Sequence, residues 1–146
     1  MNYEIVNLDQ KTIVGVSAIT GNQDPEMGTI ISGLWEKLYE DGVNAAIKNK
    51  VNEYAIGLYS DYSGEQYCVT AGNEVSKAEN EGLAVKVIPA GKYAKFSVHG
   101  NMATAVAEAW EKIWQMDLDR SFSADFEEYL NSDWENADID IYVALK

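Results

Sequence analysis

Two acidic and two aromatic residues near the C-terminal end of the chain have the types and spacing to bind a cation. The segments 125–130 and 138–143 alternate as strands do and flank a polar turn, which predicts an antiparallel hairpin. If Leu130 faces Ile139, one face of this hairpin carries Glu127, Tyr129, Asp140 and Tyr142. A carboxylate between rings suits a lipophilic cation, because the acid supplies the counter-charge and each ring face adds about 0.5–2 kcal/mol.

The other face of this hairpin would then be a core surface. It carries five apolar side chains, namely Phe126, Leu130, Ile139, Ile141 and Val143, and one acid, Glu128. A slip of one residue would exchange the two faces, so Glu128 is the rival of Glu127 for the pocket position. Spacing alone leaves another interpretation open, in which Glu127 and Asp140 face water and the tyrosines lie flat on the sheet.

Further aromatic residues could complete the wall of such a pocket. Trp35 and Trp110 lie on the apolar stripes of two predicted helices, so core packing is their first interpretation and ligand stacking the second. Trp110 is the better candidate of the two, because its half of the chain also carries the acidic hairpin. Neighbouring predicted strands supply three weaker candidates, namely Tyr54, Tyr59 and Tyr93.

A repeat in the sequence predicts how these residues are positioned. Leu-Trp-Glu-Lys at 34–37 returns as Ala-Trp-Glu-Lys at 109–112, 75 positions later, and each copy lies between one strand-like segment and two others. We therefore expect an α+β fold made of duplicated strand-helix-strand-strand units with pseudo-two-fold symmetry, an antiparallel sheet and two main helices. Its 146 residues suit one domain, with halves at about 1–72 and 83–146 and a linker at 72–82.

Local signals indicate where the elements begin and end. The first helix is expected to begin at Asp24, an N-cap acceptor followed by a proline, and to run to about Glu40. The second helix is expected to be capped near Asn101. Strand patterns occupy 4–6, 12–20, 54–59, 66–70, 83–88 and 92–98.

Charge and composition exclude several classes of function. The 24 acidic and 11 basic side chains give a net charge of -13, which would repel a polyphosphate backbone, so direct nucleic-acid binding is not expected. No signal-peptide pattern and no run of about 18 apolar residues occur, so neither secretion nor membrane insertion is indicated, and a cytoplasmic location is expected. One histidine, His99, and one cysteine, Cys68, cannot form a zinc tetrad. No phosphate-binding glycine fingerprint is present. We expect no metal and no cofactor.

Four segments carry a resemblance to a known family. They are Asp-Phe-Glu-Glu-Tyr at 125–129, Ile-Asp-Ile-Tyr-Val at 139–143, Ile-Pro-Ala-Gly-Lys-Tyr at 88–93 and Trp-Glu-Lys-Ile-Trp at 110–114. In their duplicated frame they resemble the GyrI-like, AraC-type effector-binding domain. The whole chain is similar to the free-standing branch of that family, which includes integron-associated effector-binding proteins.

This resemblance implies a fold, a ligand class and site residues. The fold is that of the effector-binding domains of bacterial transcription activators, which sense multidrug-type cationic compounds between their two halves. The family's central carboxylate falls on Glu127, and its ligand contacts in the last strand fall on Asp140 and Tyr142. Many relatives carry a proline near the end of that strand, where this chain has Ala144.

The sequence therefore favours an effector-binding protein for bulky lipophilic cations, of the kind used in transcription regulation, and not an enzyme. Two alternatives stay open. Glu127, with its pKa raised by an apolar pocket, could act as a general base in a hydrolase of reactive small molecules, as in some similar relatives. The chain could instead act on a topoisomerase or transcription partner, since the family's name-giving branch inhibits a topoisomerase and an acidic surface could imitate nucleic acid.

Overall fold

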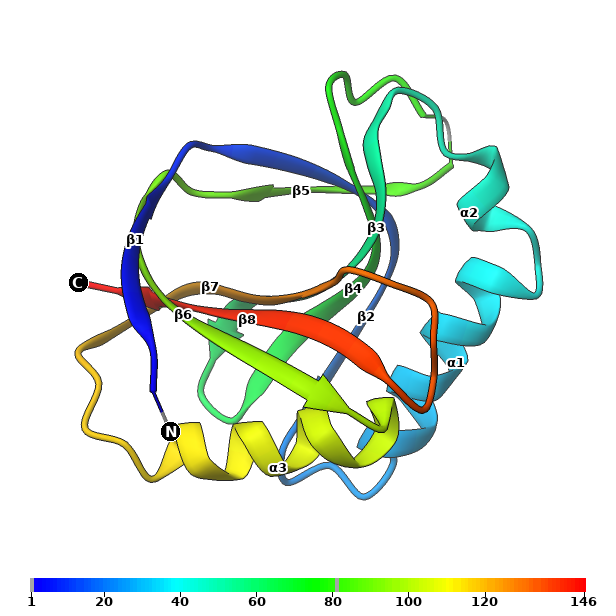
Figure 1. The fold of residues 1–146 in the computed structure, drawn as a ribbon. Coiled ribbons are helices and arrows are strands. Elements are labelled where there is room, and N and C mark those ends of the chain that lie inside the picture. Colours follow the sequence, from blue (N-terminus) through cyan, green and yellow to red (C-terminus); the bar gives the residue numbers. More distant parts are fainter. Residues whose placement is uncertain (1, 81) are drawn as a thin grey trace.

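The computed structural model describes residues 2–80 and 82–146, which form one curled antiparallel sheet with helices on its outside (Figure 1). The strands are β1 (Glu4–Leu8), β2 (Lys11–Gly21), β3 (Lys50–Ser63), β4 (Gln66–Val75), β5 (Ala84–Ile88), β6 (Gly91–Gly100), β7 (Arg120–Tyr129) and β8 (Ala137–Leu145). The helices are α1 (Met27–Tyr39), the short α2 (Val43–Ala46) and α3 (Met102–Trp114).

The order of the strands shows the expected duplication. The sheet runs β1-β6-β8-β7-β3-β4-β2-β5, and every pair is antiparallel. The first half contributes β2, α1, β3 and β4, and the second contributes β6, α3, β7 and β8 in the same sequence of element types. The halves meet where β3 pairs with β7, and each sends one strand, β1 or β5, to the far edge of the other half. The predicted α+β fold with two related units is confirmed.

Each long helix packs on the outer face of its own half. In α1, Leu34 and Leu38 are buried against β2 and β4. In α3, Trp110 and Ile113 are buried against β6 and β8. Asn101 caps α3 as predicted, because its side chain accepts a hydrogen bond from the backbone N–H of Ala103 at 3.0 Å. The seam between β3 and β7 therefore lies between the two helices.

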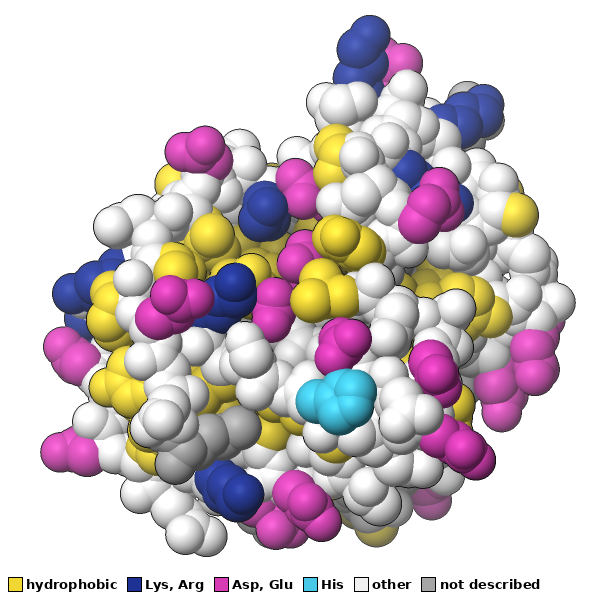
Figure 2. All heavy atoms as spheres, viewed as in Figure 1, with side chains coloured by type: hydrophobic (Ala, Val, Ile, Leu, Met, Phe, Trp, Pro, Cys, Tyr) yellow, Lys and Arg dark blue, Asp and Glu magenta, His cyan; other side chains and the backbone are white. Residues whose placement is uncertain are grey.

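The inner face of the curled sheet encloses a second apolar core. Phe126 stacks on Tyr142, with ring centroids 4.5 Å apart, and Tyr93 packs edge-on against Phe126 at 5.9 Å. Figure 2 shows apolar side chains in the hollow enclosed by the sheet, with charged side chains around them. Lys95 belongs to this charged group, since it lies 3.7 Å from Asp140. Strand alternation thus gives each strand one face toward this hollow and one toward the helices.

The register of the β7–β8 hairpin differs by one residue from the prediction. Tyr129, and not Leu130, faces Ile139. Glu127 therefore shares the outer face with Tyr129 and the apolar residues of β8, whereas Asp140 and Tyr142 lie on the inner face beside Glu128 and Phe126. The prediction that Glu127, Tyr129, Asp140 and Tyr142 share one face is wrong.

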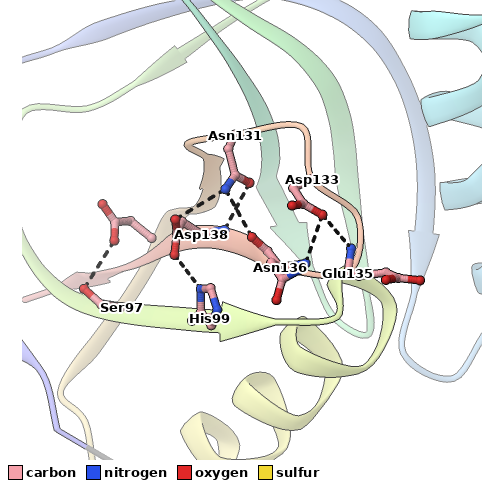
Figure 3. Close-up of polar contacts among 8 residues, drawn as sticks. Ser97, His99, Asn131, Asp133, Glu135, Asn136 and Asp138 are labelled. Atoms are coloured by element: carbon pink, nitrogen blue, oxygen red, sulfur yellow. Dashed lines mark hydrogen bonds and ion pairs between the residues drawn. The ribbon is translucent and has the colours of Figure 1, made fainter.

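The loop that follows β7 explains this shift (Figure 3). Asn131 accepts a hydrogen bond from the backbone of Asp138 at 3.2 Å and donates one to the carbonyl of Asn136 at 3.2 Å. Asp133 accepts from the backbone of Glu135 and Asn136. These side chains hold a loop that begins one residue earlier than expected, at Leu130, and a one-residue change in pairing moves every side chain of one strand to the other face.

Two element boundaries also differ from the prediction. Helix α1 begins at Met27, because Asp24 instead forms the preceding turn, where it accepts hydrogen bonds from Thr20 and from the backbone of Glu26. The expected linker begins within a strand, since β4 runs to Val75 and pairs with β2 over that length. Within the described residues, no helix has both the length and the apolar character needed to cross a bilayer.

Candidate ligand-binding site

A cavity of about 1610 Å³ opens between α1 and α3, with the β3–β7 seam as its floor. Five of the eight residues predicted for the site line it, namely Glu127, Tyr129, Trp110, Tyr54 and Tyr59. The other three do not: Asp140 and Tyr142 face the inner hollow, and Tyr93 is buried there with its hydroxyl donating to the carbonyl of Pro89 at 2.7 Å. The structure thus separates the predicted residues into two groups on opposite faces of the sheet.

Glu127 lies at the centre of the cavity floor and is only 2% exposed. Its Oε2 accepts hydrogen bonds from the indole Nε1 of Trp110 at 2.7 Å and from the hydroxyl of Tyr59 at 2.9 Å. Its Oε1 accepts from the hydroxyl of Tyr129 at 2.6 Å. The carboxylate is therefore held in one orientation by three donors from β3, β7 and α3.

Burial controls the ionisation of this group. It raises the pKa of Glu127 above the ordinary value for a glutamic acid, although the three hydrogen bonds act in the opposite direction. Burial and the nearby Glu127 carboxylate raise the pKa values of Tyr59 and Tyr129 well above those of exposed tyrosines. Both phenols are therefore protonated donors at neutral pH.

Glu127 differs from the other buried carboxylates of the described residues in having no cationic partner. Asp125 forms an ion pair with Arg120 at 2.6 Å, and Asp140 lies 3.7 Å from Lys95. Within the described residues, no side-chain nitrogen of Lys, Arg or His lies within 4.0 Å of the Glu127 carboxylate oxygens. Burying an ionised carboxylate without a cationic partner costs free energy, so a positive charge placed beside Glu127 would be stabilising.

Glu128, the rival of Glu127, lies in a different environment on the inner face. It is half-buried and pairs across the hairpin with Asp140. Burial raises its pKa, Asp140 and Glu74 add to this rise, and Lys11 and Lys95 oppose it. Glu128 thus belongs to a mixed group of charges at the edge of the inner hollow and is not among the residues that line the cavity.

The two halves contribute matching aromatic residues to the cavity. Gly57 pairs with Glu127 across the seam, and Tyr59 and Tyr129 each follow two residues later on their own strands. A Cβ at Gly57 would lie 3.0 Å from Oε1 of Glu127 and 3.2 Å from the Trp35 ring. The absence of a side chain at this position therefore makes room for the carboxylate. Sequence reasoning missed Gly57, since only the strand pairing reveals it.

Trp35, which the sequence made the weaker of the two tryptophan candidates, also contacts the site. Its ring packs edge-on against Tyr129, with centroids 5.2 Å apart, and Trp110 packs in the same way against Tyr59 at 5.8 Å. Each tryptophan also lies near an aromatic residue one helical turn further along, Tyr39 or Trp114. The repeated Trp-Glu-Lys segment was the sequence signal for this symmetry.

Apart from Tyr54, the rim of the cavity was not predicted. Exposed aromatic side chains surround it, namely Tyr39, Tyr54, Trp114, Phe122 and Trp134. The rim also has several acids, namely Glu36, Glu40, Glu53, Glu65 and Glu111, and its one basic residue among the lining side chains is Arg120. Aromatic side chains that remain exposed around a cavity are typical of a surface that binds a partner or ligand. In the described residues, no group of three His, Cys, Asp or Glu side chains is placed to hold a metal ion.

The hydrogen-bonded loop after β7 forms one end of this rim (Figure 3). Leu130, Asn131, Ser132 and Trp134 line the cavity. The carbonyl of Trp134 accepts a hydrogen bond from the backbone of Met102, at the first turn of α3, at 2.8 Å. His99 lies beneath this loop and is 2.7 Å from Asp138. Loop and helix are thus tied together where they border the cavity.

The fold is that of GyrI-like effector-binding domains, as comparison with solved structures shows. SAV2435, solved bound to tetraphenylphosphonium, aligns with a TM-score of 0.84 at 20% identity, over 100% of this chain and 94% of its own. An integron cassette protein from the mobile metagenome of Vibrio cholerae aligns with a TM-score of 0.78 at 25% identity, over 99% and 95%. The DNA-bound regulator EcmrR aligns with a TM-score of 0.61 at 16% identity, over 99% of this chain and 58% of its own.

A family model defines the relationship more closely. The model for integron-associated effector binding proteins matches residues 4–145, which is nearly the whole sequence. The chain belongs to this family. No curated protein matches it. The resemblance inferred from the four sequence segments is confirmed.

Proposed function

We propose that the protein binds a bulky lipophilic cation in the cavity between its two halves, with Glu127 as the counter-ion. The observation that carries this proposal is a buried carboxylate, on the floor of an aromatic cavity, for which residues 2–80 and 82–146 supply no cationic partner. The solved relative SAV2435, which binds tetraphenylphosphonium, supports the same class of ligand.

The physical chemistry favours a cation that is both large and poorly hydrated. Such a cation gives up little hydration on entering, and it restores a counter-charge to a carboxylate that burial has destabilised. The rings of Trp35, Trp110, Tyr59 and Tyr129 surround the carboxylate and add cation–π attraction of about 0.5–2 kcal/mol each. A strongly hydrated inorganic cation would lack this cation–π attraction and would leave most of the cavity unfilled.

The proposal is tested with three ligands of similar shape and different charge. By isothermal titration calorimetry, tetraphenylphosphonium is expected to bind more tightly than neutral triphenylphosphine oxide. The anion tetraphenylborate, which has nearly the same size as the phosphonium ion, is expected not to bind, because Glu127 and the acidic rim repel it. Equal affinity for the cation and the borate would show that the cavity selects shape and not charge.

Binding is expected to weaken as the pH falls. Only the ionised carboxylate of Glu127 can serve as counter-ion, and burial raises its pKa, so the loss should begin at a higher pH than for an exposed glutamic acid. The cation in turn favours ionisation, so binding should release protons in this range. Calorimetry in two buffers of different ionisation enthalpy measures that release. Affinity for tetraphenylphosphonium that rises on acidification would contradict the assignment.

A hydrolase is the second candidate, favoured by one specific observation. The Glu127 carboxylate, with its raised pKa, could also act as a general base. The two phenols beside it could donate hydrogen bonds to a reacting oxygen. Incubation with electrophilic small molecules such as epoxides distinguishes the two functions. Multiple turnover that is lost in Glu127→Gln, with binding retained, would favour the hydrolase.

A further inference from the structure

The cavity continues beyond Glu127 to a second aromatic group, near the β3–β4 hairpin. Ring centroids lie 5.6 Å apart for Tyr59 and Tyr67, 5.9 Å for Tyr67 and Tyr62, and 5.8 Å for Tyr62 and Phe122. The aromatic wall therefore runs without a break from a hydrogen-bond donor of Glu127 to Phe122. The cavity volume of about 1610 Å³ also exceeds the usual range of about 300–1,000 Å³ for a ligand pocket. A compact cation on Glu127 leaves this end unfilled.

Phe122 is held there in an unusual backbone conformation. Its φ of 54° lies in the left-handed region, which bulky side chains rarely adopt. It lies within the irregular part of β7, between Arg120 and Asp125, where pairing with β8 is interrupted. Its ring borders the cavity and is 51% exposed. The irregular pairing of β7 accounts for this conformation and places the ring against Tyr62 and Arg120, and the exposed part of the ring faces the cavity, where a ligand can contact it.

Arg120 determines which kind of group fits beside Phe122. Its guanidinium carbon lies 4.2 Å from the centroid of the Phe122 ring, and one of its terminal nitrogens bonds Asp125 at 2.6 Å. Its Nε is buried and has no hydrogen-bond partner among the described atoms. A second positive charge would be repelled here, because the guanidinium already occupies one face of the ring. An uncharged ring avoids this repulsion. An oxygen on that ring can accept a hydrogen bond from the other terminal nitrogen of Arg120, Nη1, which has no partner among the described atoms.

We propose that Tyr62, Arg120 and Phe122 form a second subsite, which takes an uncharged aromatic ring carrying a hydrogen-bond acceptor. The inference rests on the proposed function, since a cation on Glu127 fixes the other end of the ligand. Phe122 lies five residues before Glu127, so their Cα atoms are at most about 17 Å apart along an extended strand. Ligands that fill both are elongated aromatic cations with a neutral, oxygen-bearing ring.

Three triphenylphosphonium compounds with different fourth substituents test this subsite. The substituents are propyl, 3-phenylpropyl, and 3-phenylpropyl with a para methyl ester. The added ring is expected to tighten binding about fivefold, and the ester about fivefold again. In Phe122→Ala, the three compounds should converge on the affinity of the propyl compound, which should change less than about twofold. Phe122→Leu keeps an apolar side chain but loses the ring, so it should behave in the same way.

Stability measurements and Glu127→Gln separate the possible outcomes. Phe122→Gly should melt about 3 °C above Phe122→Ala, since only glycine relieves the left-handed backbone. Equal binding of the three compounds to the natural protein, or equal losses for all three in Phe122→Ala, would overturn the second subsite but not the proposed function. If none of the compounds binds, or if Glu127→Gln leaves all three affinities unchanged, the proposed function fails and the subsite fails with it.

Discussion

Replacing Glu127 with glutamine is expected to weaken tetraphenylphosphonium binding by at least about 1.5 kcal/mol, which is more than tenfold, because the ligand loses its counter-charge. Glutamine has nearly the same shape and keeps one oxygen to accept hydrogen bonds from Trp110, Tyr59 or Tyr129. The cavity should therefore remain intact. Calorimetric titration with tetraphenylphosphonium and with neutral triphenylphosphine oxide measures the effect, and the neutral compound should lose little.

Glu128→Gln is the matched control for this experiment. It removes the same charge from the next residue, whose side chain lies on the inner face of the sheet and outside the cavity. Its affinity for tetraphenylphosphonium should stay within about twofold of the natural protein, since the remaining effect is long-range and screened by salt. If Glu128→Gln lost more affinity than Glu127→Gln, the counter-ion would be Glu128 and the assignment to Glu127 would be wrong.

Much of the fold could be predicted because its signals are local or repeated. The two Trp-Glu-Lys segments predicted two related helices, and alternation placed the strands around them. Glu127, Tyr129 and Trp110 were assigned to one site from residue type, position and the resemblance to a known family, and the structure brings all three into contact. Spacing alone did not decide whether Glu127 faces water or is buried, and the structure shows that it is buried.

The remainder depended on features that sequence patterns do not encode. The register of the last hairpin depends on the hydrogen bonds of Asn131 and Asp133 within the loop, and a shift of one residue moved Asp140 and Tyr142 to the inner face. The role of Gly57 follows only from its pairing with Glu127 across the two halves. Non-local pairing decides such positions.

Asp125 and Glu127 show the same difficulty within one strand. Both are acids on the outer face of β7, two residues apart, and both are buried. The irregular pairing before Asp125 brings Arg120 back to neutralise it, whereas Glu127 is left with uncharged donors. Residue type and alternation treat the two acids alike, so only the structure separates an acid that stabilises the fold from one that is available to a ligand.

This difference predicts opposite effects on stability. Asp125→Asn is expected to lower the free energy of unfolding by about 3 kcal/mol, because it leaves the guanidinium of Arg120, which is only 16% exposed, without its counter-charge. Tyr62, which donates to the same carboxylate oxygen at 2.5 Å, also loses a charged acceptor. Glu127→Gln removes a carboxylate whose burial is unfavourable, so it should leave the free energy of unfolding unchanged or raise it. Urea unfolding of both variants measures the contrast.

Asp138→Asn provides the control for the loss of an exposed carboxylate contact. Asp138 lies 2.7 Å from His99 with both side chains largely exposed, so its replacement should cost less than about 1 kcal/mol. Adding Arg120→Met to Asp125→Asn should restore part of the lost stability, because the unpaired charge is then gone. If Asp125→Asn proved as mild as Asp138→Asn, the Arg120 pair would not be what holds the irregular part of β7. The assignment of Asp125 to stability and Glu127 to binding would then lose its physical basis.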